Sequence, residues 1–353
     1  MKRSIITLAL VLVVAMLTGC AGTPVVYYSD CTCPTGAHTE TDPAETIDPI
    51  ESKPAESQPI TAEGEVKTGV AIVASAGDSK NASKDANDEN VNGQADYDVT
   101  IVAVNVDGNG VITNCIIDSI GTKVGFDNAG VLSADLTASI QTKNELGDAY
   151  NMKLYGGAKY EWYEQAAALA SYAVGKTVEE LRSGAVGESG YAQDADLATT
   201  ATIYLGGYVS TIETAVANAQ YLGAEVGDEL KLGIIPSVSG SKSADAENEG
   251  LAQLDVDAVA LTMRDGVITS DLTAPIQTKN QLGESYGMVA WGNAIAEWNQ
   301  QAASFAAYIT GKTPAEVSGI AVDEGTKPTD ADLTASVTIA IGGFQALIAK
   351  ACG

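Results

Sequence analysis

Two hydroxyl-rich segments contain the residues best suited to chemistry in this chain. They read DADLATTATIYLGGY from Asp194 and DADLTASVTIAIGGF from Asp330, 136 positions further on. Hydroxyl side chains in the first turn of a helix, together with its unpaired N–H groups and positive dipole end, form a site for an anion or phosphate. We therefore predict that each segment starts a helix whose first turn binds such a group. The alternatives are ordinary helix N-caps or, for the Thr-x-Thr spacing, a buried strand.

A second pair of matching segments combines a cation with aromatic rings. The stretches QTKNELGDAYNMKLYGG and QTKNQLGESYGMVAWGN place Lys143 and Lys279 a few residues before the rings of Tyr155 and Trp291. A lysine and aromatic faces could hold a planar, anionic ligand such as a flavin by charge pairing and stacking. The alternative is a lysine on a solvated loop with aromatic rings that fill the core.

Composition excludes most enzyme chemistry that depends on histidine. The only histidine is His38, so a His-based triad and an HExxH zinc site are ruled out. Cys31 and Cys33 lie near it, but their spacing matches no strong zinc pattern, and a disulfide or free thiols are the better interpretation. Paired aspartates are numerous, yet none has the spacing of an EF-hand. We therefore predict neither catalytic residues nor a metal site.

The folded part of the chain is a tandem repeat. Residues 135–216 align without gaps to residues 271–352, and residues 97–113 resemble residues 254–269. A period this long indicates a duplicated domain rather than a solenoid unit. The second copy lacks the segment NCIIDSIGTKVGFDNAGVLS, which follows Thr113 in the first copy. We expect it to have lost one strand and its loop.

The elements that must position these segments follow from the periodicity of apolar residues. Residues 97–113 and their counterpart alternate with period two around a glycine turn, which indicates an antiparallel hairpin. Helical spacing predicts helices over 160–175 and 297–311, and Thr177 and Thr313 are placed to cap a short helix after each. The hydroxyl-rich segments then continue as helices. We predict an α+β fold: two tandem copies of an antiparallel sheet with helices packed on one side.

The N-terminal segment reads as a lipoprotein signal. Lys2 and Arg3 precede an apolar run that ends in LTGC at Cys20, so we expect lipidation of Cys20 and a membrane-anchored protein on the extracellular face. A single membrane-spanning helix is the alternative. The next residues are rich in Pro, Thr, Glu and Ser, which predicts a disordered tether. The expected divisions are the signal peptide (1–20), the tether (21–65), repeat 1 (66–223) and repeat 2 (224–353).

The charge of the chain limits its partners. Against 19 basic side chains there are 46 acidic ones, which gives a formal net charge of −27. Such a field repels polyanions and anionic lipid surfaces, so we expect no nucleic-acid partner. The partners that we expect are the membrane that holds the lipid anchor and, for an electron carrier, a redox partner at the cell surface.

The strand order, the DGNGVIT turn and the terminal Asp-x-x-Thr-x-x-Thr segment together resemble the FMN-binding domain family of membrane electron-transfer subunits and flavin-carrying surface lipoproteins. In that family the end motif is Asp-x-x-Ser/Thr-Gly-Ala-Thr, and its last Thr can be esterified to the FMN phosphate. Residues 196–202 are similar, with Thr200 in place of the Gly, whereas residues 332–338 have neither the Gly nor the Ala.

The resemblance implies FMN as the cofactor. It implies Thr202 and Thr338 as flavin acceptors and Thr199, Thr200 and Ser336 as phosphate contacts. With the cations and rings identified above, the candidate cofactor-binding set is Thr199, Thr200, Thr202, Ser336, Thr338, Lys143, Lys279, Tyr155 and Trp291.

Two functions remain open from the sequence. The first is a membrane-anchored extracellular lipoprotein with two FMN-binding-like domains, which carries flavin or transfers electrons at the cell surface. The alternative is a cofactor-free lipoprotein that binds a solute or a cell-wall component. Either would be an electron carrier or a binding protein rather than a catalyst, because no nucleophile–base pair is visible.

Overall fold

The computed structural model describes residues 64–273 and 283–353, and its architecture is the predicted α+β fold with antiparallel sheets. The first sheet has four strands in the order β5-β4-β1-β6. They are β1 (Glu65–Ser75), β4 (Gly93–Val106), β5 (Ile112–Phe126) and β6 (Gln220–Glu225). The predicted hairpin is the β4–β5 pair, and Gly110 in its turn has a φ of 82°, which glycine adopts without strain.

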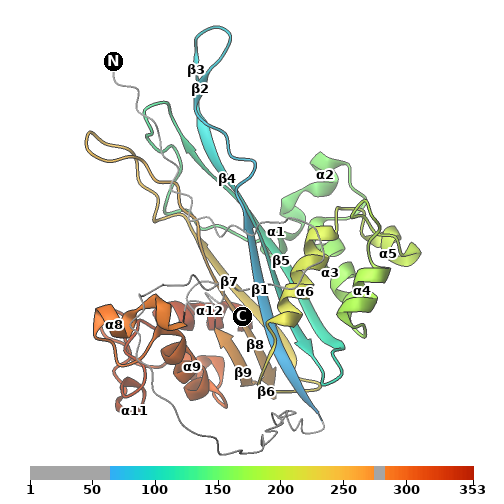
Figure 1. Cartoon of the computed structure of the whole chain (residues 1–353), viewed down its shortest axis with the longest axis vertical. Helices are drawn as coiled ribbons and strands as arrows, with labels where there is room; N and C mark the ends of the chain where they lie inside the picture. Colours follow the sequence, from blue (N-terminus) through green and yellow to red (C-terminus); the bar gives the residue numbers. More distant parts are fainter. Residues whose placement is uncertain (1–63, 274–282) are drawn as a thin grey trace, which may run out of the picture. The chain divides into compact units, whose positions relative to one another are not determined.

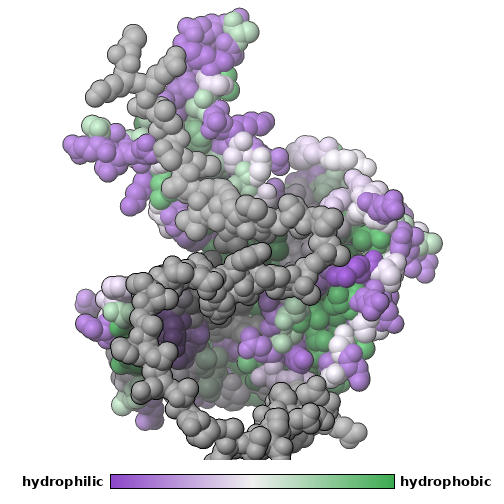
Figure 2. Space-filling model, viewed as in Figure 1, coloured by the Kyte–Doolittle hydropathy of each residue, from purple (hydrophilic) through white to green (hydrophobic). Residues whose placement is uncertain are grey.

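A small hairpin precedes β4. Its strands are β2 (Ser83–Lys84) and β3 (Asn90–Val91), which pair with each other in a separate two-stranded sheet. All four residues are exposed, and hydrophilic side chains cover the tip of the hairpin (Figure 2). This tip contributes no apolar side chain to the buried clusters described below.

The second sheet has three strands in the order β7-β8-β9. They are β7 (Glu229–Ser237), β8 (Asp255–Arg264) and β9 (Val267–Thr273). The prediction that the second copy has lost a strand is therefore wrong, because β9 is a shortened counterpart of β5. The residues directly after the glycine turn keep the pairing with β8. Without them the backbone of β8 would be an unpaired edge, which sheets avoid.

Helices cover one face of each sheet, as Figure 1 shows. In the first half, α3 lies on β5 and α6 lies on β4 and β1; in the second half, α9 lies on β9 and α12 lies on β7 and β8. The helices of the first half are α1 (Lys143–Leu146), α2 (Met152–Gly156), α3 (Trp162–Ala173), α4 (Val178–Gly184), α5 (Ala195–Thr200) and α6 (Gly206–Ala217), with a 3-10 turn at Gly147–Tyr150. Those of the second half are α8 (Met288–Gly292), α9 (Trp298–Ile309), α10 (Pro314–Ser318), α11 (Ala331–Thr334) and α12 (Gly342–Cys352), with a 3-10 turn at Gly283–Tyr286.

The predicted capping boxes are present after each long helix. The hydroxyl oxygen of Thr177 accepts from the N–H of Glu180, whose carboxylate accepts from the N–H of Thr177; Thr313 and Glu316 repeat this pair. Each box satisfies two N–H groups that a helix start leaves without a partner. The two short helices therefore begin at the positions that the sequence predicted.

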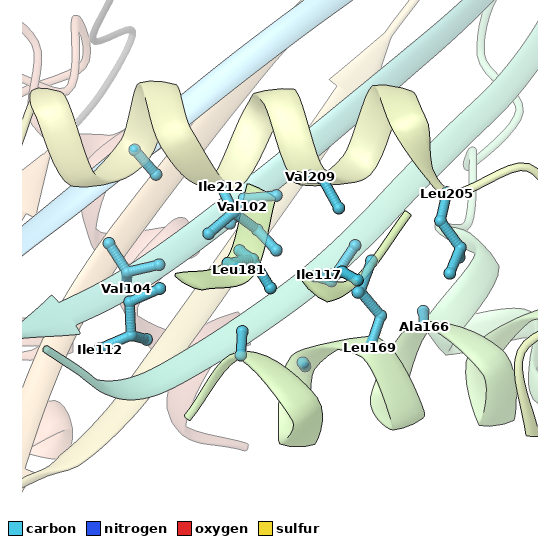
Figure 3. Close-up of a cluster of buried hydrophobic side chains, with 14 of the residues drawn as sticks. Val102, Val104, Ile112, Ile117, Ala166, Leu169, Leu181, Leu205, Val209 and Ile212 are labelled. Atoms are coloured by element: carbon cyan, nitrogen blue, oxygen red, sulfur yellow. The ribbon is translucent and has the colours of Figure 1, made fainter. Parts of the chain in front are cut away.

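Each half has an apolar core between its sheet and its helices. In the first half, Val102 and Ile117 from the sheet meet Leu169 of α3 and Ile212 of α6, as Figure 3 shows. The second half repeats this layer, with Leu261 of β8 and Phe305 of α9 among its fully buried members. Burial of such side chains stabilises a fold by about 1.5–3 kcal/mol each.

A third apolar cluster joins the two sheets on the faces that carry no helices. It contains Val70, Val99, Ile101, Ala103 and Ile120 from the first sheet, and Leu230, Ile234, Ala258 and Ala260 from the second. The two copies therefore share a core. The segment that links the two copies is also part of the first sheet. It forms β6, which pairs with β1 and includes the predicted boundary between the repeats, at residues 223 and 224.

Two glycines allow the long C-terminal helices to approach the sheets closely. A Cβ atom at Gly69 of β1 would clash with the carbonyl oxygen of Ala215 in α6, and one at Gly233 of β7 would clash with that of Leu347 in α12. Gly207, in the first turn of α6, has no atom within 4 Å of an added Cβ.

We expect Gly69→Ala and Gly233→Ala each to destabilise the protein by about 1–3 kcal/mol, because the helix must move away from its strand. Gly207→Ala is the matched control and should be neutral or stabilising, since alanine favours the helix. Urea unfolding monitored by circular dichroism measures all three. Equal stabilities for the three variants would contradict the close approach.

Candidate functional site

Two buried polar side chains at the start of α3 bind the segments that carry Tyr155 and Thr202. Glu161 and Gln165 lie one helical turn apart, and both are almost fully buried. Glu297 and Gln301 occupy the same places at the start of α9 and are equally buried. A buried carboxylate or amide needs hydrogen-bond partners. The partners show what each side chain holds in place.

Glu161 links α2 to α3 through hydrogen bonds. Its carboxylate accepts from the N–H of Met152 at 2.7 Å and from the N–H of Lys153 at 3.1 Å, and it also caps the start of α3. In the second half, Glu297 accepts from the N–H groups of Met288 and Val289 at 2.9 and 3.0 Å. One carboxylate thus satisfies the free N–H groups at two helix starts in each half.

Gln165 holds the hydroxyl-rich segment. Its side-chain oxygen accepts from the N–H of Thr202 at 2.7 Å, from its hydroxyl at 3.1 Å, and from the N–H of Ile203 at 3.1 Å. In the second half, the side-chain oxygen of Gln301 accepts from the N–H and hydroxyl of Thr338 at 2.7 and 3.1 Å. The predicted acceptors Thr202 and Thr338 therefore have equivalent positions, each bound to a buried amide.

The prediction that the hydroxyl groups start a helix is wrong. The first helix starts earlier, because the carboxylate of Asp194 accepts from the N–H groups of Asp196 and Leu197 and caps α5. This places Thr199 and Thr200 in the last turn of α5. The next helix, α6, starts only at Gly206. Thr202 lies between the two helices and belongs to neither.

The hydroxyl groups of the predicted phosphate contacts are already used within the segment. That of Thr199 donates to the carbonyl of Asp196 at 2.7 Å, that of Thr200 to the carbonyl of Leu197 at 3.1 Å, and that of Ser336 to the carbonyl of Leu333 at 3.4 Å. The end of a helix where Thr199 and Thr200 lie presents carbonyl oxygens and a negative dipole. This environment disfavours an anion.

The predicted cation Lys143 is buried rather than solvated. Only 9% of the residue is exposed, and its ammonium nitrogen lies 5.4 Å from the ring centre of Tyr150 and 5.3 Å from that of Trp162. Its nearest carboxylate is Asp98, at 3.9 Å. Lys143 therefore belongs to a cation–π contact inside the protein. Lys279 lies outside the described residues.

The predicted rings differ from the nearby tryptophans of the long helices. Trp162 and Trp298 are buried core residues, but Tyr155 on α2 is 83% exposed and Trp291 on α8 is 89% exposed. These two occupy equivalent positions in the two copies. They contribute to no buried cluster among the described residues.

Two clefts formed by described residues lie elsewhere. One of about 380 Å³ lies between β5 and α3 and includes Asn114, Cys115 and Ser171; another of about 360 Å³ includes Tyr308 and Lys312. Neither includes a predicted site residue. Burial raises the pKa of the Cys115 thiol to about 12, so this cysteine is not a nucleophile at neutral pH.

Two further searches of the described residues were negative. No group of three or more metal-ligating side chains occurs in residues 64–273 and 283–353. Within the same ranges, no helix has both the length and the apolar character needed to cross a bilayer.

Comparison with known proteins gave no match to a family model, a curated protein or a solved structure. Function must therefore be argued from the geometry of this chain.

Sequence reasoning missed the buried glutamate and glutamine on the long helices. The signal was present, because both copies contain Glu-Trp-x-x-Gln at the helix start, as residues 161–165 and 297–301. An acidic residue and an amide at such positions read as solvated side chains when the sequence is considered alone.

We expect Gln165→Met and Gln301→Met to destabilise the protein by about 1–3 kcal/mol each, because methionine fills the space but removes the acceptor for the backbone N–H groups. Gln220→Met is a suitable control, since Gln220 is exposed and a surface substitution changes stability by about 0.5 kcal/mol or less. Chemical unfolding of the three variants tests this. Losses no larger than that of the control would show that the amides are dispensable.

Proposed function

We propose that this chain is a membrane-anchored extracellular lipoprotein that binds a solute or cell-wall component without a cofactor. The main support is a contrast among the described site residues. The hydroxyl groups of Thr199, Thr200 and Ser336 and the ammonium group of Lys143 have partners within the protein. The rings of Tyr155 and Trp291 instead extend into solvent. An exposed aromatic ring that has no part in a core is a feature of binding surfaces.

The proposal includes the anchor and the tether expected from the sequence. Lipidation at Cys20 would hold the protein on the outer face of the membrane, and residues 21–65 would place the folded part at a distance from it. The net charge of −27 would keep that part away from anionic lipid. A protein held in this way can reach the cell wall.

The flavin carrier is the second candidate, and one observation favours it. Thr202 is an exposed residue, as a covalent flavin acceptor must be. However, the surrounding residues fit an FMN phosphate poorly. Thr199 and Thr200 donate to backbone carbonyls, and the ammonium group of Lys143 lies over two rings inside the protein.

We expect the mature protein, purified from its source organism, to be colourless and to stay colourless after incubation with FMN, because the predicted phosphate contacts among the described residues already have partners within the protein. Absorbance and intact mass measure this. A yellow protein with a mass increase that matches FMN would contradict the proposal and establish the flavin carrier. Loss of that increase in Thr202→Ala/Thr338→Ala would then identify the acceptors.

We expect the protein, produced without its lipid, to sediment with purified cell walls of its source organism, and Tyr155→Ala/Trp291→Ala to reduce the bound fraction at least tenfold. The control is Tyr204→Ala, which removes another exposed ring whose equivalent position in the second copy is Ala340. Cell walls that retain the double variant as well as the wild type would rule out the rings as the binding surface.

A further inference from the structure

We infer that the ligand of the two exposed rings is a neutral polysaccharide, with Tyr155 and Trp291 each stacked on a sugar ring. This inference rests on the proposed function and names its ligand class. The face of an aromatic ring is electron-rich, and one face of a pyranose presents several C–H groups with partial positive charge. The two surfaces are flat, similar in size and complementary.

The rings are displayed on rigid supports. Each of the two short helices is bracketed by residues in the left-handed conformation: Asn151 and Gly157 around α2, and Gly287 and Asn293 around α8. The first N–H groups of both helices are fixed by buried carboxylates, those of Glu161 and Glu297. A support that is ordered before binding reduces the entropy lost on association.

The Trp291 ring is further restricted by its own loop. A Cβ atom added at Gly287 would clash with the indole, so the ring lies against the backbone of that glycine. The Cδ1–Nε1 side of the indole is thus held close to this backbone, while the residue as a whole remains 89% exposed. Such a ring presents a fixed surface.

The local charge indicates a neutral ligand. Charged residues make up 18% of the chain, yet residues 287–296 around Trp291 contain none, and residues 149–158 around Tyr155 contain only Lys153. A polyanion would be repelled by the remaining surface, and a polycation would be drawn to the acidic residues elsewhere. Lys153 is paired with the carboxylates of Asp148 and Glu164, at 3.8 and 3.5 Å. The two short helices thus carry no unpaired charge beside the rings, which matches an uncharged sugar chain.

The size of the surface also distinguishes a sugar from a protein. A stable protein interface requires about 800 Å² on each partner. Beside Tyr155, Leu154 is the other large apolar side chain exposed on α2. Near Trp291, the side chains of Val289 and Ile295 are exposed. Each ring thus has only a few large apolar neighbours, whereas a protein interface uses about 20–30 residues on each side.

The duplication explains why a polymer is a better ligand than a free sugar. Stacking on one ring gives weak binding, and a polymer long enough to reach both rings gains affinity from the second without any new kind of contact. The sequence preserves an aromatic residue at this position in both copies although their loops differ in most other residues.

The test uses the full mature chain without its lipid and three insoluble neutral probes: microcrystalline cellulose, chitin, and peptidoglycan from which anionic polymers have been removed. We expect retention on at least one probe. We also expect a shift in tryptophan fluorescence with its soluble oligosaccharides, because Trp291 is exposed whereas Trp162 and Trp298 are buried.

Variants separate stacking from other contributions. Tyr155→Ala and Trp291→Ala should each reduce retention on the polymer at least tenfold, Trp291→Phe should restore most of it, and Tyr204→Ala should leave it unchanged. Because all the substituted rings are exposed, the unfolding midpoints should stay at the wild-type value, which separates lost binding from lost folding.

The outcomes are distinct. Binding to untreated cell walls but to none of the neutral probes would overturn the ligand class while the proposed function stands. Absence of binding to untreated walls would overturn both. Retention on phosphatidylcholine vesicles or on a polyanion such as polygalacturonate, without retention on the neutral probes, would also overturn the inference and indicate a lipid or anionic ligand.

Discussion

Glu161 is the N-cap residue of α3, and Gln165 lies one turn further along the helix. The carboxylate of Glu161 and the amide oxygen of Gln165 bind backbone N–H groups from two segments that are distant from each other in sequence. One is α2, which precedes the helix, and the other lies about forty residues beyond it at Thr202. Because both side chains are buried, the loss of either acceptor would leave N–H groups without a partner, at a cost of about 1–3 kcal/mol each. In the first half, the positions of α2, which carries Tyr155, and of Thr202 depend on these two side chains.

The same turn occurs in the second half with Glu297 and Gln301. The residues that surround it have changed: the lysine of α2 has no counterpart on α8, and Tyr155 is replaced by Trp291. The buried hydrogen bonds are therefore common to both copies. They fix the short helix that carries the exposed ring in each copy. This arrangement suits a binding surface whose ligand contacts can vary while the fold stays constant.

The two copies depend on each other through the shared core between the sheets. A chain of buried hydroxyl groups accompanies this core: the hydroxyl of Thr68 lies 3.4 Å from that of Ser270, which lies 2.6 Å from that of Thr262. This series of hydroxyl groups ends at Asp228. The carboxylate of Asp228 accepts from the hydroxyl of Thr269 and from the guanidinium of Arg264. Since a shift of one residue would separate these groups, they favour a single register between the sheets.

The sequence predicted the fold well because its signals were local. Alternation in β4 and β5, helical spacing in α3 and α9, and the capping boxes at Thr177 and Thr313 each depend on a few neighbouring residues. The wrong helix starts were predicted where two candidate N-cap residues lie close together in the sequence. Asp194 and Asp330 are stronger N-caps than the threonines that follow them, so the helices start earlier and the hydroxyl groups fall at their ends.

The burial of Lys143 and of the glutamate and glutamine pairs could not be predicted from local pattern. Each is polar, and each is buried only because a distant segment supplies its partner: the Trp162 ring for Lys143, and the backbone of α2 and of Thr202 for Glu161 and Gln165. Such partners become visible only when the chain is folded. The repetition of Glu-Trp-x-x-Gln in both copies was the one trace of them in the sequence.

Hydrogen exchange of individual amides, followed by nuclear magnetic resonance, is the most direct measurement of the buried hydrogen bonds that are common to both copies. The account predicts slow exchange for the N–H groups of Met152, Thr202, Met288 and Thr338, although they lie in short helices and linkers at the surface, because each donates to a buried side chain. Exchange of these four amides at the rate of an unstructured peptide, while the amides of α3 and α9 remain protected, would contradict it.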